Sequence, residues 1–212
     1  MKDPREFVLR HTVWQRHAMV PEIELALASE ITPIWQATEA WLAREGIEPP
    51  FWAFAWPGGV AMARHILDHP ETVAGKRVLD FAAGCGIAAI AAAQAGAAAA
   101  SAAEIDPLAI AAVELNAAHN GVTLELLARD IVGEPNRWDL ILCGDVCYEA
   151  PMTRHILPWL KELTRDAPVW IADPGRAYVP ENSVTEFARY DVPTARELED
   201  QEIRTTRLLK LA

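Results

Sequence analysis

Up to about residue 45, apolar residues recur at a spacing typical of α-helices. Pro21 suits the first turn of one helix, whose apolar face would include Ile23. A second helix would follow and carry Trp35 and Trp41, two side chains of the kind that usually pack in a core. This pattern predicts an N-terminal helical extension over residues 1–48.

From residue 49 onward, short apolar runs alternate with helical segments. Residues 138–143, W-D-L-I-L-C, are typical of a strand that is buried on both faces in a parallel sheet. The alanine-rich residues 97–103 have helical propensity, but we predict a strand there, because Glu104 then lies at its carboxyl end, where a nucleotide-binding fold needs an acid. Strands are predicted at residues 77–81, 97–103, 122–127, 138–143, 169–172, 188–192 and 205–210, and helices at residues 60–67, 87–95, 107–118, 152–163 and 182–187.

These elements predict an α/β fold, a three-layer, Rossmann-like domain over residues 49–212 with an open, mostly parallel seven-stranded sheet. The last two predicted strands form a hairpin, so the sheet would end in an antiparallel strand, whereas an ordinary dinucleotide-binding domain ends on parallel strands. A chain of 212 residues, 51% of them hydrophobic, is long enough to bury a sizeable core in one such domain.

The composition argues against several classes of function. The net charge is −11, and no cluster of Lys or Arg is present to neutralise phosphates, so we expect no nucleic-acid partner. Gly, Pro and charged residues interrupt every apolar run before it reaches transmembrane length, so we expect no membrane association. Cys85, Cys143 and Cys147 lack C-x-x-C spacing and are expected to be buried thiols rather than a disulfide or metal site. The first residues fit neither a signal nor a transit peptide, and with these cysteines they predict a cytoplasmic protein.

Residues 78–86, V-L-D-F-A-A-G-C-G, contain the pattern that says most about function. The small residues Ala82, Gly84 and Gly86 would turn a strand sharply into a helix and present backbone N–H groups to a ligand. The turn also matches the dinucleotide fingerprint G-x-G-x-x-A, with an acid, Glu104, about 20 residues further on. The sequence therefore predicts a nucleotide-binding turn, and the alternative is that the glycines only open a helix.

Asp80 distinguishes between two kinds of nucleotide. Its carboxylate would repel the pyrophosphate of NAD, whereas it would attract the cationic amino and sulfonium groups of S-adenosylmethionine. We therefore predict that this turn binds the methionine end of S-adenosylmethionine. An NAD-linked oxidoreductase is the alternative.

Acidic residues follow five successive predicted strands, at the edge of the sheet where open α/β folds bind their ligands. These residues are Asp80, Glu104, Asp130, Asp145 and Asp173. Glu104 would accept hydrogen bonds from ribose hydroxyls and Asp130 from an adenine amino group, with Ile131 packing on the ring. Some of these acids would instead cap helices or turns, and Asp173, which precedes a proline, is the best candidate for such a role.

Asp145 and Tyr148 lie in one loop after the fourth of these strands, where both can face a methyl group in transfer. Methyl transfer from a sulfonium needs no metal, but it needs an amine held about 3 Å from the methyl group, away from water. Asp145 can hold a lysine ammonium, and Tyr148 can orient the nitrogen once its proton has left. A helix cap is the alternative role for Asp145.

Two further side chains are predicted to contact ligands. Trp56 lies beside two glycines that permit a close approach of the backbone, so we predict that it contacts the nucleotide. Arg176 lies on a loop that follows a strand and is predicted to contact the substrate. A loop ion pair is the alternative for Arg176.

Five segments of the chain together resemble one known family: P-P-F-W-A-F-A-W-P-G-G, D-F-A-A-G-C-G, A-E-I-D-P, W-D-L-I-L-C-G-D-V-C-Y and D-P-G-R. They resemble the electron transfer flavoprotein beta-subunit lysine methyltransferases, which are class I, seven-β-strand protein methyltransferases with a D-x-x-Y motif, here Asp145 and Tyr148. The resemblance implies S-adenosylmethionine-dependent methylation of lysines on the flavoprotein's beta subunit, with Trp56 and Gly144 also lining the cofactor site. Three alternatives remain: a methyltransferase of another protein such as a ribosomal protein, one of a small amine, and a catalytically silent S-adenosylmethionine-binding protein.

Overall fold

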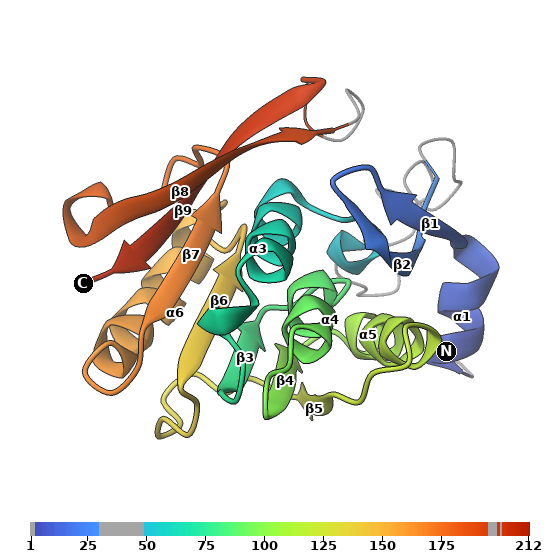
Figure 1. The fold of residues 1–212 in the computed structure, drawn as a ribbon, viewed down its shortest axis with the longest axis horizontal. Helices are drawn as coiled ribbons and strands as arrows, with labels where there is room; N and C mark the ends of the chain where they lie inside the picture. Colours follow the sequence, from blue (N-terminus) through green and yellow to red (C-terminus); the bar gives the residue numbers. More distant parts are fainter. Residues whose placement is uncertain (1–2, 30–48, 195–198, 200) are drawn as a thin grey trace.

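The computed structural model describes residues 3–29, 49–194, 199 and 201–212, and a seven-stranded sheet forms its centre (Figure 1). Its strands are β3 (Arg77–Phe81), β4 (Ala99–Glu104), β5 (Glu125–Ala128), β6 (Leu140–Gly144), β7 (Val169–Asp173), β8 (Val184–Pro193) and β9 (Ile203–Leu211). They lie in the order β5-β4-β3-β6-β7-β9-β8. Strands β3 to β7 pair in parallel, whereas β9 runs antiparallel to both of its neighbours, β7 and β8. This order confirms the predicted open, mostly parallel sheet with an antiparallel C-terminal strand, β9, which lies between β7 and the edge strand β8.

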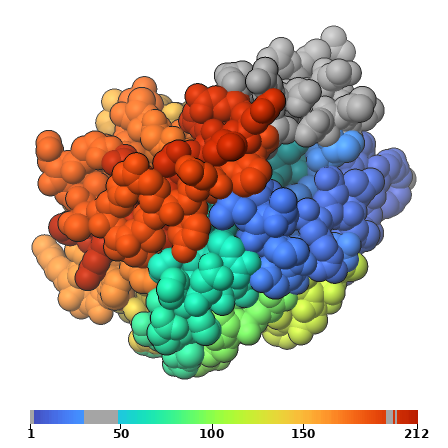
Figure 2. Space-filling model, turned by 45° about the horizontal axis from the view of Figure 1, so that its top comes forward, coloured from blue at the N-terminus to red at the C-terminus, as the bar shows by residue number. Residues whose placement is uncertain are grey.

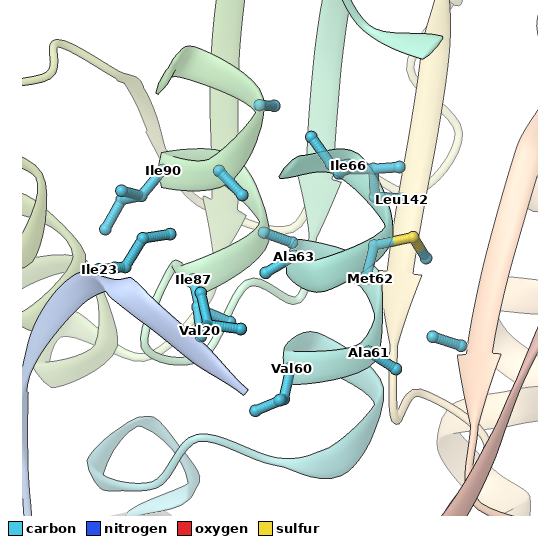
Figure 3. Packing of buried hydrophobic residues seen from close by; sticks show 14 of the residues in the cluster. Val20, Ile23, Val60, Ala61, Met62, Ala63, Ile66, Ile87, Ile90 and Leu142 are labelled. Atoms are coloured by element: carbon cyan, nitrogen blue, oxygen red, sulfur yellow. The ribbon is translucent and has the colours of Figure 1, made fainter. Parts of the chain in front are cut away.

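Helices cover both faces of this sheet (Figure 1). One face carries α3 (Pro57–Asp68), α4 (Ile87–Gln94) and α5 (Pro107–His119), and the other carries α6 (Ala150–Leu163). Successive strand residues point to opposite faces, so Val78 packs with α3 and α4, whereas its neighbour Leu79 packs with α6. Figure 3 shows how side chains from α3, α4, β6 and the N-terminal strand β2 (Val20–Leu27) meet in the core that contains Val78. The chain thus forms the three layers that its pattern predicts.

The alanine-rich segment forms strand β4, as predicted, although alanine favours helices. This strand pairs with β3 on one side and β5 on the other. Ala102 is fully buried and packs with Ala89 of α4 and Val113 of α5. Pairing and packing partners that are distant in sequence therefore decide the conformation of these residues.

The N-terminal segment folds as helix α1 (Pro4–His11) followed by an antiparallel hairpin of β1 (Val13–His17) and β2 (Val20–Leu27). The predicted helix from Pro21 is therefore wrong. The buried residues Ile23, Leu25 and Leu27 are spaced by two, which is the spacing of a strand, and they join the core between α3 and α4. The second predicted helix, with Trp35 and Trp41, lies outside the described residues.

The hairpin also touches the other end of the chain. The His17 Nε2 atom lies 3.0 Å from the carbonyl oxygen of Pro193, at the end of β8. Figure 2 shows the blue N-terminal segment beside the red C-terminal strands. The helix predicted at residues 182–187 is wrong as well, because the β-branched residues Val184 and Thr185 pair with β9 and leave only the short 3-10 turn η3 (Glu181–Ser183).

Two predictions from composition can be compared with the structure. Cys85, Cys143 and Cys147 are buried free thiols, which confirms the expectation for them. In the described ranges, no helix combines the length and the apolar character that crossing a membrane would require.

Candidate active site

A cavity of about 610 Å³ opens where β3, β4 and β6 end, because the last residue of each of these strands contributes to its wall. It is lined by most of the residues that the sequence predicts for the site: Trp56, Ala82, Gly84, Glu104, Asp130, Gly144, Asp145, Tyr148 and Arg176. These residues are far apart in the chain, but the carboxyl ends of parallel strands share one edge of the sheet. The volume suits a ligand of small-molecule size.

Gly86 and Ile131 do not line this cavity. The Ile131 side chain is 1% exposed and packs in the core beside α6, whereas its neighbour Val132 faces the cavity. The prediction that the Ile131 side chain packs on a ligand ring is therefore wrong, and Val132 is the residue of this pair that lines the cavity. A Cβ atom on Gly86 would lie 3.0 Å from the Val113 side chain, so this glycine allows α4 to pack closely on α5.

Asp80 is buried beneath the turn rather than exposed to the large cavity. Its Oδ2 atom accepts a hydrogen bond of 2.9 Å from the Ala89 N–H, in the first turn of α4. The carboxyl group lines a smaller cavity of about 40 Å³, which shares Gly84, Gly144 and Asp145 with the large one. Burial, together with the charge of Glu104, raises the pKa of Asp80 to about 8, so a cationic group bound nearby would favour its ionised form.

The turn after β3 positions the acid of the next strand. Gly84 has a φ of 56°, in the left-handed region that favours glycine, and within the described structure no atom lies within 4 Å of where its Cβ would be. The Gly84 N–H donates a hydrogen bond of 2.9 Å to Glu104 Oε1, and the Ile105 N–H donates one of 3.0 Å to Oε2. Burial raises the pKa of Glu104. The carboxylate is thus fixed at the cavity wall while its remaining lone pairs stay available.

Asp130 occupies the far end of the cavity, after β5. Its Oδ1 atom accepts a hydrogen bond of 2.9 Å from the Val132 N–H, and its Oδ2 atom lies 2.9 Å from His155 Nε2. Burial would raise the pKa of Asp130, but these two hydrogen bonds outweigh it and lower the pKa. His155 also lines the cavity, and no sequence pattern predicts it, because it lies in the first half of α6 without any recognisable motif.

The W-P-G-G and D-x-x-Y motifs, which the sequence presents as separate signals, form one site. Asp145 follows β6 with a φ of 55°, and its Oδ2 atom accepts hydrogen bonds of 2.6 Å from the Gly58 N–H and 3.3 Å from the Gly59 N–H. Asp145 therefore caps the first turn of α3, which is distant in the chain, whereas the predicted alternative is a cap of the helix that follows Asp145. A Cβ on Gly58 would lie 2.5 Å from both the Ala172 carbonyl oxygen and Asp145 Oδ2, so glycine is required for this approach.

The second oxygen of Asp145, Oδ1, is buried and lies near a cationic side chain. Among the described residues, Oδ1 has no hydrogen-bond donor, and the Arg176 Nη2 atom lies 3.5 Å from it. Burial raises the pKa of Asp145 to about 7, against the attraction of Arg176 and with the repulsion of Asp173. Asp173 caps the loop that carries Arg176, because its Oδ1 atom accepts hydrogen bonds from the Gly175 and Arg176 N–H groups.

Aromatic rings line one side of this cavity. The Tyr148 ring lies 5.4 Å from that of Phe51, and the Phe51 ring lies 5.9 Å from that of Trp56. Phe51 belongs to the short 3-10 turn η1 (Phe51–Ala53), and its carbonyl oxygen accepts a hydrogen bond of 2.7 Å from Trp56 Nε1. These contacts bring the aromatic residues 51–56 against Tyr148 of the D-x-x-Y motif.

The strand order, the antiparallel edge and the glycine turn between β3 and α4 define a class I methyltransferase fold. The family model described as "Ribosomal protein L11 methyltransferase (PrmA)" matches residues 61–158. A solved structure of magnesium protoporphyrin IX methyltransferase (ChlM) from Synechocystis PCC 6803, with bound SAM, superposes with a TM-score of 0.54 and 13% identity. The match covers 84% of this chain and 97% of that one.

Two curated relatives identify the family within this class. The electron transfer flavoprotein beta subunit lysine methyltransferase of Xenopus laevis is 40% identical over 82% of this chain and 71% of that protein. The protein of the same name from Danio rerio is 36% identical over 86% of this chain and 71% of that protein. The chain therefore belongs to the electron transfer flavoprotein beta subunit lysine methyltransferase family, which confirms the resemblance seen in its sequence motifs.

Proposed function

We propose that this protein transfers methyl groups from S-adenosylmethionine to lysine side chains of the electron transfer flavoprotein beta subunit. One observation carries the proposal: Asp145, which lines the cavity together with Tyr148, has a buried oxygen, Oδ1, without a hydrogen bond from any described residue. A buried carboxylate oxygen with spare lone pairs is a binding position for an ammonium group. Membership of the family supports lysine as the acceptor.

The residues at the cavity fit S-adenosylmethionine. Glu104 would accept hydrogen bonds from the ribose hydroxyls, and Asp130 would accept one from the adenine amino group, with Val132 against the ring. The backbone at Gly84 leaves space for close approach, and Asp80 lies directly beneath it. When bound, S-adenosylmethionine supplies an electrophilic methyl group on a sulfonium.

The remaining chemistry belongs to the chain's own residues. A lysine has an ordinary pKa near about 10.4, so it arrives mostly as an ammonium, which ionised Asp145 would attract. With a pKa of about 7, this carboxyl is also suited to accept a proton near neutral pH. Tyr148 would orient the neutral nitrogen, and the rings of Phe51 and Trp56 would exclude water.

The acceptor is tested by offering two proteins to the purified enzyme. The flavoprotein and ribosomal protein L11 would each be incubated with S-adenosylmethionine, and their masses measured. We expect lysines of the flavoprotein beta subunit to gain about 14 Da for each methyl group, which is the mass of the one CH₂ unit added. Methylation of L11 alone would support the second candidate, which the family-model match over residues 61–158 favours, and would contradict the proposal.

The cellular location follows as a smaller part of this proposal. The three buried free thiols suit a reducing compartment, so we propose that the protein acts in the cytoplasm. Fractionation of the source cells, with detection of the protein in the soluble and envelope fractions, tests this location.

A further inference from the structure

A buried carboxylate that no sequence motif includes lies next to the proposed methyl-transfer site. Glu199 precedes β9, and its side chain is only 3% exposed. Its Oε1 atom accepts a hydrogen bond of 2.5 Å from Arg176 Nη2, and its Oε2 atom lies 3.3 Å from Arg204 Nε. A buried carboxylate between two guanidinium groups is held firmly, because removing either partner leaves a charge poorly compensated.

Arg176 lies between Glu199 and Asp145, and its guanidinium group is closer to Glu199 than to Asp145. The same Nη2 atom that donates to Glu199 is 3.5 Å from Asp145 Oδ1, which is close enough for an ion pair but too far for a normal hydrogen bond. The remaining groups that face Asp145 are the Gly58 and Gly59 N–H groups, which occupy Oδ2, and the carboxylate of Asp173. Oδ1 is thus the oxygen of Asp145 that a substrate could use.

The charge of Arg176 is a difficulty for the proposed function, and it also counts against the predicted role of Arg176 as a substrate contact. The sulfonium and the incoming lysine ammonium are both cations, so a third cation in the same cavity disfavours them. If Arg176 were hydrogen-bonded to Asp145 Oδ1, a lysine would have to displace it first. We propose, on the basis of the proposed function, that Glu199 is a positioning residue that holds Arg176 away from Asp145 and so keeps Oδ1 for the ammonium of the protein substrate.

The test replaces Glu199 by Gln, which keeps its size but removes its charge. Arg176 should then bind Asp145 and compete with the substrate, so KM for the protein substrate should rise about tenfold. We expect kcat and the Kd for S-adenosylmethionine to change less than about twofold. Glu186→Gln is the matched control, because Glu186 forms an exposed ion pair with Arg189 on β8 and should leave all three constants unchanged.

A double variant separates this role from a purely structural one. In Glu199→Gln/Arg176→Gln the competing cation is gone, so KM should return to within about threefold of the wild-type value. The free energy of unfolding of both variants is measured as well, because removing both partners of a buried ion pair can also relieve damage to the fold. A purely structural role predicts that KM rises and recovers only together with this free energy, whereas the positioning role predicts a raised KM in a single variant that remains fully folded. A double variant with a KM as high as that of Glu199→Gln, or a loss of cofactor binding in the single variant, would overturn the proposal.

A crystal structure of Glu199→Gln gives a readout that needs no protein substrate. Arg176 Nη2 should lie within hydrogen-bond distance of Asp145 Oδ1, instead of the 3.5 Å seen here. If the guanidinium moves in this way but the flavoprotein is not methylated, the substrate assignment fails and the role of Glu199 stands. If the guanidinium stays in place, the role of Glu199 is refuted whatever the substrate.

Discussion

At the scale of single residues, the two oxygens of Asp145 differ in their contacts. Oδ2 caps α3 through Gly58 and Gly59, and Oδ1 is buried without a hydrogen bond from any described residue. Asp145→Ala would remove both oxygens together. Asp145→Asn keeps an oxygen for the cap and loses the charge that attracts a lysine ammonium.

We therefore expect Asp145→Asn to lower the methylation rate by about 100-fold or more while calorimetry still shows S-adenosylmethionine binding. Asp166→Asn, an exposed position after α6, is the control and should retain full activity. Loss of cofactor binding in Asp145→Asn would mean that the residue acts on the nucleotide site and not on the acceptor.

Two of the buried acids of the site, Asp80 and Asp145, also predict how stability depends on pH. Burial raises the pKa of Asp80 to about 8 and that of Asp145 to about 7, both above their value in an unfolded chain. The folded state therefore binds more protons between about pH 4 and pH 8, so the free energy of unfolding of the ligand-free protein should fall as the pH rises through this window. Each carboxyl can contribute a slope of up to about 1.4 kcal/mol per pH unit.

Urea unfolding at several pH values would measure this slope. Asp80→Asn should make it shallower, because the variant no longer has the group that ionises in the folded state near pH 8. An equally steep slope in the variant would mean that Asp80 is ionised in the folded protein. The comparison with the variant is needed because burial lowers the pKa values of His17 and His65, which adds a slope of opposite sign below about pH 6.5.

At the scale of elements, the first turn of α3 joins two motifs that lie far apart in the chain. A methyl group at Gly58 would collide with the Ala172 carbonyl oxygen and Asp145 Oδ2, each 2.5 Å away, so Gly58→Ala should push α3 from β6 and β7. We expect a loss of about 1–3 kcal/mol in the free energy of unfolding and a strong loss of activity. Thermal unfolding and a methylation assay check this.

Gly121→Ala is the control that separates the loss of stability from the loss of activity. Gly121 has a φ of 69°, but no described atom lies within 4 Å of its Cβ position. The substitution should cost about 1–2 kcal/mol through backbone strain alone, with activity retained at a permissive temperature. If Gly58→Ala keeps comparable activity, the cap on α3 does not position Asp145.

How far the sequence predicts each element depends on whether local or distant contacts decide it. The turn from β3 into α4 is local, so its glycines and the acid after β4 could be predicted from spacing. The hairpin of β1 and β2 could not be predicted in this way. The spacing of Ile23, Leu25 and Leu27 suits a strand, whereas Pro21 and the surrounding apolar residues suit a helix. Only packing against α3 and α4 decides between these conformations.

The same distinction applies to the site. Position after a strand places Asp130 and Asp145 correctly at the cavity, because all carboxyl ends of the parallel strands lie at one edge. It does not tell which of Ile131 and Val132 faces the ligand, since that depends on the direction of each side chain. Glu199 reaches the site from the segment before β9, outside any β-α unit, and no spacing rule could have indicated it.

At the scale of the whole molecule, the N-terminal hairpin belongs to the same core as the sheet and its helices. Leu25 is fully buried together with residues of α3 and α4, and His17 contacts the end of β8. A segment that merely extended a separate domain would not share its core in this way. Stability of the site should therefore depend on the hairpin, although no described residue of β1 or β2 lines the cavity.

Leu25→Ala tests this dependence. The substitution removes buried methyl groups from the core between α3 and α4 and should lower the free energy of unfolding of the entire protein by about 2–5 kcal/mol, in a single transition. Leu9→Ala on α1 is the matched control, because this side chain is 49% exposed and should cost less than about 0.5 kcal/mol. If Leu25→Ala instead produced a separate early transition, with the main one unchanged, the hairpin would be an independent unit and α3 would hold the site without it.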